Sequence, residues 1–163
     1  MIVVSNTSPL TNLAAINHFE LLQKLYGAIH IAQGVWQELN HGGLRHPGSR
    51  EVEGASWCHH YEVSSRDLVT TLRRDLDKGE AETLALAIEL KADLVLLDEQ
   101  EGRHAAIRLG LVPLGVLGVL LQAKRLGMIE EIRSRLDALR HQAGFFLKDS
   151  LYRQMLEQAG EKV

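Results

Sequence analysis

The sequence predicts an α/β fold in which helices flank a mainly parallel central sheet. Short, unbroken runs of β-branched and aliphatic residues, typical of strands buried on both faces, alternate with longer segments of helical periodicity. Aromatic residues make up only 5% of the chain, so aliphatic side chains must build the core. The length of 163 residues suits one domain with a substantial core, and we expect a single domain over residues 1–163.

The first half of the chain supplies two predicted strands and several helices. Ile2 to Val4 form a β-branched run that ends at Ser5. Ser8 and Pro9 then match a helix start, with serine as the N-cap and proline as the first helical residue. The other elements expected here are helices over 10–16, 19–25, 33–39, 50–55 and 68–76, a strand over 28–31, a loop over 41–48 and an extended stretch over 57–63.

The second half continues the alternation. The segment EAETLALAIELKA has an almost wholly apolar interior, which predicts a helix buried on most sides. Leu94 to Leu97 form a continuous apolar strand that ends at Asp98. The remaining expected elements are helices over 100–109, 116–125, 128–140 and 150–159 and a strand over 112–114. This alternation indicates a layered α/β architecture rather than separate helical and sheet domains.

Composition limits the classes of function. The net charge of -3 lacks the strongly basic character of proteins that hold nucleic acid by bulk charge, so RNA would need a local basic patch. The single cysteine, Cys58, excludes an intramolecular disulfide and suits a reducing compartment. The longest apolar run, 111–121, contains Pro113 and is shorter than the ~20 residues of a membrane helix. We expect a soluble, cytoplasmic protein without a signal peptide.

Acidic and amide side chains stand where the predicted elements end. One strand ends at Asn6 and another at Asp98 and Glu99, while Glu80 lies in the first turn of the buried helix and Glu38 near the end of the third helix. Sites in open parallel sheets form at the carboxyl ends of the strands. Magnesium and manganese prefer oxygen ligands, and two such ions can clamp a phosphodiester. The sequence therefore raises the hypothesis of a divalent metal site.

Glu80, Asp98 and Asn6 also have purely structural interpretations. Asp77 and Glu80 are three residues apart at a helix start, so Glu80 could be half of a capping box. Asp98 and Glu101 have the same spacing. Asn6 could only satisfy the turn that follows the first strand.

Several segments in this order resemble a PIN domain. They are VVSNTSPL, VWQEL, GEAETLALAIEL followed by ADLVLLDEQEGRHAA, and GVLGVLLQAKRLGMI. The combination, which covers most of the chain, is similar to the VapC-like subgroup of PIN toxins. The resemblance implies a PIN-like three-layer fold and an endoribonuclease that depends on Mg²⁺ or Mn²⁺. It also implies an RNA substrate, a cognate antitoxin and a homodimer.

The resemblance assigns roles to particular residues. The strand-end acid of the family falls on Asn6, and the other metal-binding and catalytic acids fall on Glu38, Glu80 and Asp98, with Glu99 a competitor for the role of Asp98. The chain departs from the family at Asn6, where aspartate is usual. An asparagine keeps a carbonyl oxygen but brings no negative charge and cannot act as a base, so weaker metal binding is expected.

Two further positions correspond to substrate-binding residues of the family. Ser8 matches a small hydroxyl residue, and Arg103 matches a basic position that could contact a phosphate, although it could equally be an exposed helix arginine. Glu82 is a substitute for Glu80 but faces another way on the helix.

An endoribonuclease is thus the leading hypothesis, with a weakened PIN-like protein that binds RNA or protein as the alternative. A metal-dependent phosphatase acting on small substrates is the third.

Overall fold

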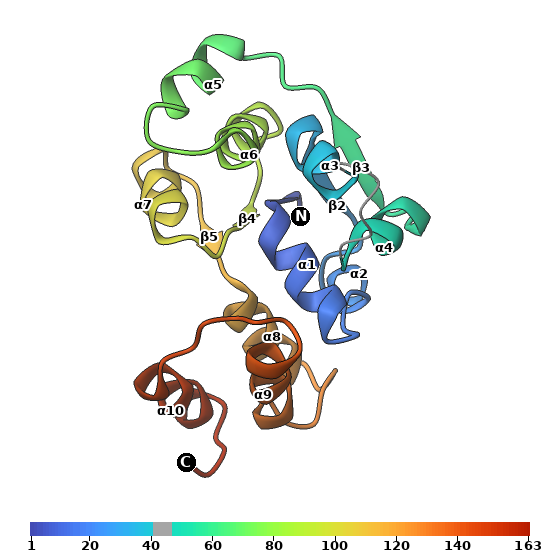
Figure 1. Ribbon diagram of the computed structural model, residues 1–163, viewed down its shortest axis with the longest axis vertical. Helices are drawn as coiled ribbons and strands as arrows, with labels where there is room; N and C mark the ends of the chain where they lie inside the picture. Colours follow the sequence, from blue (N-terminus) through green and yellow to red (C-terminus); the bar gives the residue numbers. More distant parts are fainter. Residues whose placement is uncertain (41–46) are drawn as a thin grey trace.

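The computed structural model describes residues 1–40 and 47–163, and this part of the chain forms an α/β fold (Figure 1). All the strand pairs in its five-stranded sheet are parallel, and the strand order is β3-β2-β1-β4-β5. The strands are β1 (Val3–Ser5), β2 (Ile29–Ala32), β3 (Cys58–Tyr61), β4 (Leu94–Leu96) and β5 (Pro113–Leu114). The predicted fold class is therefore confirmed, and the sheet is wholly parallel. The predicted loop over 41–48 lies largely outside the described residues.

Helices cover both faces of the sheet, which gives three layers. They are α1 (Thr7–Ala15), α2 (Leu21–Tyr26), α3 (Gln33–Asn40), α4 (Ser49–Gly54), α5 (Arg66–Leu72), α6 (Lys78–Glu89), α7 (Gln100–Arg108), α8 (Val116–Arg125), α9 (Arg133–His141) and α10 (Asp149–Gln158). Alternate residues of a strand point to opposite faces. Val3 accordingly packs in the core with α1, α2 and α8, whereas Val4 packs with α5, α6 and α7. Helix α6 is buried from Gly79 to Ala87, as its apolar sequence predicts.

Two predicted helix starts are wrong. Helix α1 begins at Thr7 with Asn6 as its N-cap, so Pro9 is the third helical residue and Ser8 is inside the helix. The Ser8 hydroxyl bonds Asp98 instead of capping the helix, and proline is tolerated because first-turn amides lack intrahelical partners. The helix predicted over 128–140 begins only at Arg133. Ile129 and Ile132, upstream of this helix, are still buried, but they lie in an irregular segment.

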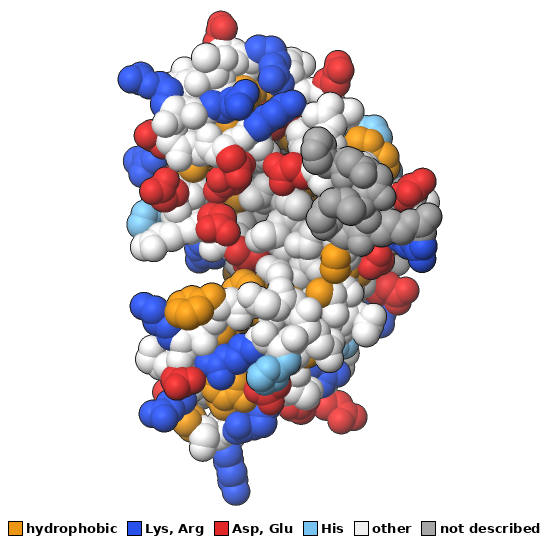
Figure 2. Space-filling model, in the orientation of Figure 1, with side chains coloured by type: hydrophobic (Ala, Val, Ile, Leu, Met, Phe, Trp, Pro, Cys, Tyr) orange, Lys and Arg blue, Asp and Glu red, His pale blue; other side chains and the backbone are white. Residues whose placement is uncertain are grey.

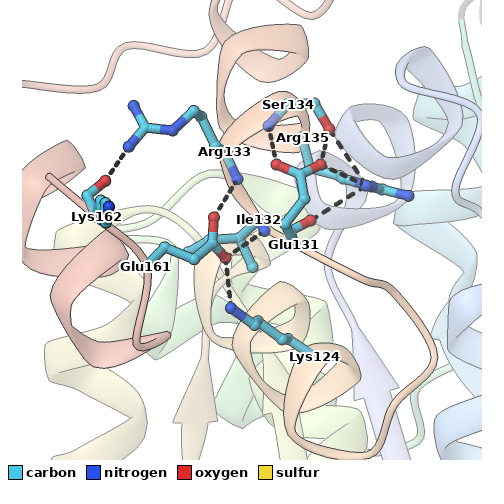
Figure 3. A network of polar contacts seen from close by, with 8 residues as sticks. All are labelled: Lys124, Glu131, Ile132, Arg133, Ser134, Arg135, Glu161 and Lys162. Atoms are coloured by element: carbon cyan, nitrogen blue, oxygen red, sulfur yellow. Dashed lines mark hydrogen bonds and ion pairs between the residues drawn. The ribbon is translucent and has the colours of Figure 1, made fainter.

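The C-terminal end of the chain determines where α9 begins (Figure 3). The Glu161 carboxylate accepts hydrogen bonds from the backbone amides of Ile132 (2.7 Å) and Arg133 (3.2 Å) and from Lys124 Nζ (2.8 Å). The Arg133 side chain in turn donates to the carbonyl of Lys162. We call these residues the C-terminal clamp, because they tie the end of the chain to α8 and to the start of α9.

Three basic side chains of the C-terminal helices form ion pairs. Besides the Lys124–Glu161 pair of the clamp, Arg135 lies 2.7 Å from Glu131, and an ion pair of 3.0 Å joins Arg140 and Asp149. Because these three charges are paired within the chain, they contribute little to the local basic patch that RNA binding would need. Among residues 1–40 and 47–163, no helix combines the length and the apolar character needed to cross a bilayer.

Candidate metal centre at the carboxyl edge of the sheet

The ends of β1 and β4 bring two predicted site residues next to each other. The strands pair with Ser5 opposite Leu96, and the Asn6 amide donates to the Leu96 carbonyl at 2.9 Å. Asn6 directly follows Ser5 and Asp98 comes two residues after Leu96, so both site residues leave the sheet at the same edge. This edge lies beside the start of α6, where the Thr83 hydroxyl approaches Asn6 Oδ1 at 3.4 Å.

Asp98 is held in one orientation by donors from two helices. Its Oδ2 accepts from Ser8 Oγ at 2.7 Å and from Asn12 Nδ2 at 3.3 Å, and its Oδ1 accepts from the Val116 amide at 2.7 Å. The last contact places the carboxylate at the N-terminus of α8, where the helix dipole favours negative charge. Ser8, predicted to bind substrate, thus orients an acid. Asn12 was missed by the sequence analysis, although it lies one turn after Ser8 on the same helix face.

Glu80 is the most perturbed of the predicted acids. The capping box with Asp77 is confirmed: Asp77 Oδ1 accepts from the Glu80 amide at 2.8 Å, and Glu80 Oε1 accepts from the Asp77 amide at 3.3 Å. The residue is only 8% exposed. Desolvation, together with the negative charges of Asp77 and Glu99, raises the pKa of Glu80 to about 7. A cap alone does not require a carboxylate so close to two others.

Glu99 and Glu101 occupy the start of α7. Glu99 is the N-cap residue of this helix, but its side chain makes no capping hydrogen bond. A capping box between Asp98 and Glu101, the structural alternative, would need Asp98 at the N-cap position and is therefore wrong. Glu99 acts instead as a neighbouring negative charge on Glu80.

Glu38 reaches the same edge from α3. Its Oε2 accepts a hydrogen bond of 2.7 Å from Thr7 Oγ1, directly beyond the end of β1. Desolvation raises the pKa of Glu38 above its ordinary value, the Thr7 hydroxyl lowers it, and the charge of Asp77 raises it again. Asp77 therefore acts on both Glu38 and Glu80. Spacing along the chain predicts Asp77 only as a cap, because its position beside a second acid arises from folding.

Three glycines make room for three carboxylates. A Cβ atom on Gly79 would collide with Glu38 Oε1. A Cβ atom on Gly102 would lie 3.0 Å from an oxygen of Glu80, and one on Gly115 would lie 3.0 Å from an oxygen of Asp98. Contacts this short are tighter than ordinary van der Waals contact. The glycines therefore permit the carboxylates to occupy their positions.

Arg103 and Glu82 have different surroundings. Arg103 Nη1 donates to the carbonyl of Leu97 at 3.3 Å, so its guanidinium lies beside the end of β4. Glu82 is 2% exposed, and its Oε1 accepts from the Gly34 amide at 3.0 Å. Its other oxygen lies 3.7 Å from Arg66 Nη2. Glu82 therefore joins α3 to α6 as a paired structural acid, which agrees with the expectation that it faces away from Glu80.

The donor chemistry of this edge fits a hard divalent cation. Carboxylate and amide oxygens are its preferred ligands, and Asn6, Glu38, Glu80 and Asp98 are the residues that would hold it. Within the described ranges, however, no three His, Cys, Asp or Glu side chains already lie in a group arranged to hold a metal ion. Figure 2 shows acidic side chains gathered over α6 and α7 and around the hollow beside the C-terminal helices. A cation would reduce the repulsion that raises the pKa of Glu80.

Comparison with known proteins identifies the family. A sequence profile of the PIN domain matches residues 2–161, which is nearly the whole chain. No curated protein matches the chain. The match agrees with the parallel sheet flanked by helices and with a polar site beyond the ends of β1 and β4. The chain belongs to the PIN domain family.

Proposed function

We propose that this protein is an endoribonuclease that depends on Mg²⁺ or Mn²⁺. The observation that carries the proposal is the placement of Glu38, Glu80 and Asp98, three acids from distant segments, each beside a glycine that a larger residue would crowd. The membership of the PIN family supports a nuclease fold. The finer assignment, a VapC-like toxin, rests on the sequence resemblance.

The residues of the chain suggest a division of labour. When bound, a divalent ion lowers the pKa of a water molecule and stabilises charge on a phosphodiester. Glu80, whose second carboxylate oxygen faces Gly102, would help to hold the ion and to orient the attacking water. Asp98 keeps one orientation through Ser8 and the α8 amide. Arg103 would hold the RNA backbone near the end of β4.

Cleavage of single-stranded RNA with Mn²⁺ tests this proposal. We expect wild-type cleavage to stop with a chelator and to fall by a factor on the order of 100 in Asp98→Asn. Asp67→Asn, a matched change of an exposed aspartate on α5, should retain wild-type activity. Activity that persists in Asp98→Asn and with chelator would reject the mechanism.

A second candidate is a PIN-like binding protein whose metal site has weakened. The observation that favours it is Asn6, which is neutral and 6% exposed and whose carbonyl oxygen is within reach of the Thr83 hydroxyl. Under this alternative, millimolar Mn²⁺ leaves the melting temperature of the wild type unchanged, because a ligand that binds the native state must stabilise it. If Mn²⁺ raised the melting temperature of Asn6→Asp, the missing negative charge at position 6 would be the cause of the weakened metal binding.

The biological setting is also a proposal. As a VapC-like toxin, the protein would act in the cytoplasm, form a homodimer and bind a cognate antitoxin. Induced expression in bacteria should then arrest growth, and Asp98→Asn should relieve the arrest. Light scattering of the purified chain measures its oligomeric state. Normal growth with abundant soluble wild-type protein would argue against a toxin.

A further inference from the structure

A pocket of about 650 Å³ adjoins the acidic edge. It lies between α1, α3 and the segment that follows α9, and Thr7 and Glu38 belong both to its wall and to the candidate metal centre. Its volume is within the range of pockets that take small ligands or single groups of larger ones. A group bound in this pocket would therefore lie close to a substrate chain that crosses the carboxyl edge of the sheet.

The wall of this pocket is rich in neutral hydrogen-bonding groups. Three primary amides line it, those of Asn12, Gln37 and Gln142, together with the hydroxyls of Thr7 and Thr11. Primary amides carry both donors and acceptors. These groups match the mixed donor and acceptor edges of nucleobases, which proteins read in unpaired RNA.

The apolar part of the wall and its charges fit the same ligand. Ala15, Leu39 and Ala143 supply surfaces against which a flat ring can pack. A phosphate would instead be drawn to cations, and the charged groups among the described lining residues are Lys78 and Glu38, which are of opposite sign. Lys78 Nζ also donates to Gln37 Oε1 at 3.1 Å. The lining therefore favours a base over a phosphate.

We propose that this pocket receives an unpaired nucleobase of the RNA substrate and selects its identity through Gln37 and Gln142. The inference rests on the proposed ribonuclease function and adds the part of the substrate that is read. Single-stranded RNA is required, because a base inside a duplex cannot leave its stack to enter a pocket without cost. Because Glu38 borders both the pocket and the acidic edge, a base in the pocket would bring the neighbouring phosphodiester to this edge.

Two substitutions change the pocket without touching the acids. Gln142 is exposed on the segment after α9, so Gln142→Ala removes an amide without disturbing the core. Ala143→Phe fills the pocket from its wall and serves as an independent second variant. Gln154→Ala is the matched control, since Gln154 is an exposed glutamine on α10 that does not line the pocket.

The experiment measures binding apart from cleavage. Fluorescence anisotropy in low salt with a chelator gives the affinity for labelled U, C, A and G decamers, and a Mn²⁺ assay gives kcat/KM for the same oligonucleotides. We expect the wild type and Gln154→Ala to prefer one base. Gln142→Ala and Ala143→Phe should bind the preferred decamer about tenfold more weakly, with unchanged melting temperature.

The outcomes separate this inference from the proposed function. Base-selective binding that both pocket variants lose, without any Mn²⁺-dependent cleavage, would support the pocket and reject the nuclease. Cleavage with wild-type base preference in both variants would overturn the pocket and leave the nuclease standing. Equal binding of all four decamers by the wild type, or no binding of any, would also overturn the pocket.

Discussion

Two carboxylates with small exposed fractions, Glu80 at the acidic edge and Glu161 in the C-terminal clamp, have opposite electrostatic surroundings. The Glu80 residue is 8% exposed and the Glu161 side chain 12%. Desolvation acts on both, and near Glu80 the charges of Asp77 and Glu99 add to it. At Glu161, hydrogen bonds from Lys124 and from two backbone amides outweigh desolvation, so its pKa lies below the ordinary value. Burial alone therefore does not distinguish a structural acid from a functional one; the neighbouring charges do.

The largest effect on stability is expected from breaking the clamp. Glu161→Ala leaves Lys124, whose side chain is 22% exposed, and the first amides of α9 without their acceptor. We expect a loss of about 2–3 kcal/mol in the free energy of unfolding, measured with urea. Glu157→Ala, an exposed position on α10, should change little. Equal stability of the two variants would show that the clamp contributes nothing.

The opposite sign is expected at the acidic edge. Glu80→Gln keeps an oxygen that can accept the capping hydrogen bond but removes a charge that Asp77 and Glu99 repel. The variant should gain about 1–2 kcal/mol of stability at pH 8 and much less at pH 5, where Glu80 of the wild type is already protonated. Nuclease activity should fall. Urea denaturation at both pH values measures the gain. A loss of stability at pH 8 would mean that the negative charge of Glu80 stabilises the start of α6 more than its acidic neighbours repel it.

The two acids should also give opposite slopes of stability against pH. Since the pKa of Glu80 is raised from 4.5 to about 7 on folding, the native state binds more protons across this range. Its contribution to stability therefore falls as pH rises from 4.5 to 7. Glu161 has a lowered pKa, so its contribution is present above pH 4.5 and is lost as pH falls through the folded value. Comparing the wild type with Glu80→Gln and with Glu161→Gln across pH 3–8 isolates the two slopes.

The smallest effect on stability, paired with a clear effect on activity, is expected at Gly79. Alanine there favours the helix by less than about 1 kcal/mol, but its methyl group must displace the Glu38 carboxylate. We expect a melting temperature within a few degrees of the wild type and a loss of RNA cleavage of about tenfold. Gly54→Ala is the control, because a Cβ there meets nothing within 4 Å. Full activity in Gly79→Ala would show that the position of Glu38 is unimportant.

Local patterns predicted most of the fold because they act over a few residues. Alternate residues of β1 and β4 pack on opposite faces of the sheet, as expected from the direction of strand side chains. The boundaries of α8 are those expected from its periodicity. The late start of α9 was not predictable, because Glu161, some thirty positions further on, captures its first amides. Tertiary contacts of this kind override local helical preference.

The sequence predicts the acids of the candidate site but not the residues that orient them, act on their charge or make room for them. Asn6 and Asp98 follow apolar strands, so their place at the sheet edge could be inferred from topology. The role of Asn12 as a donor to Asp98, and that of Asp77 as a charge shared by two glutamates, arise only from folding. The same holds for the glycines that give room to the carboxylates.

Direct measurement of Mn²⁺ binding tests the central claim, which is that acids from separate segments of the chain jointly bind a divalent metal ion. Electron paramagnetic resonance during a titration measures the concentration of free Mn²⁺ and therefore gives the number of ions bound. We predict binding by the wild type that is lost in the double variant Glu80→Gln and Asp98→Asn and is kept in Glu161→Gln. Equal binding by all three proteins, or none by the wild type, would contradict the account.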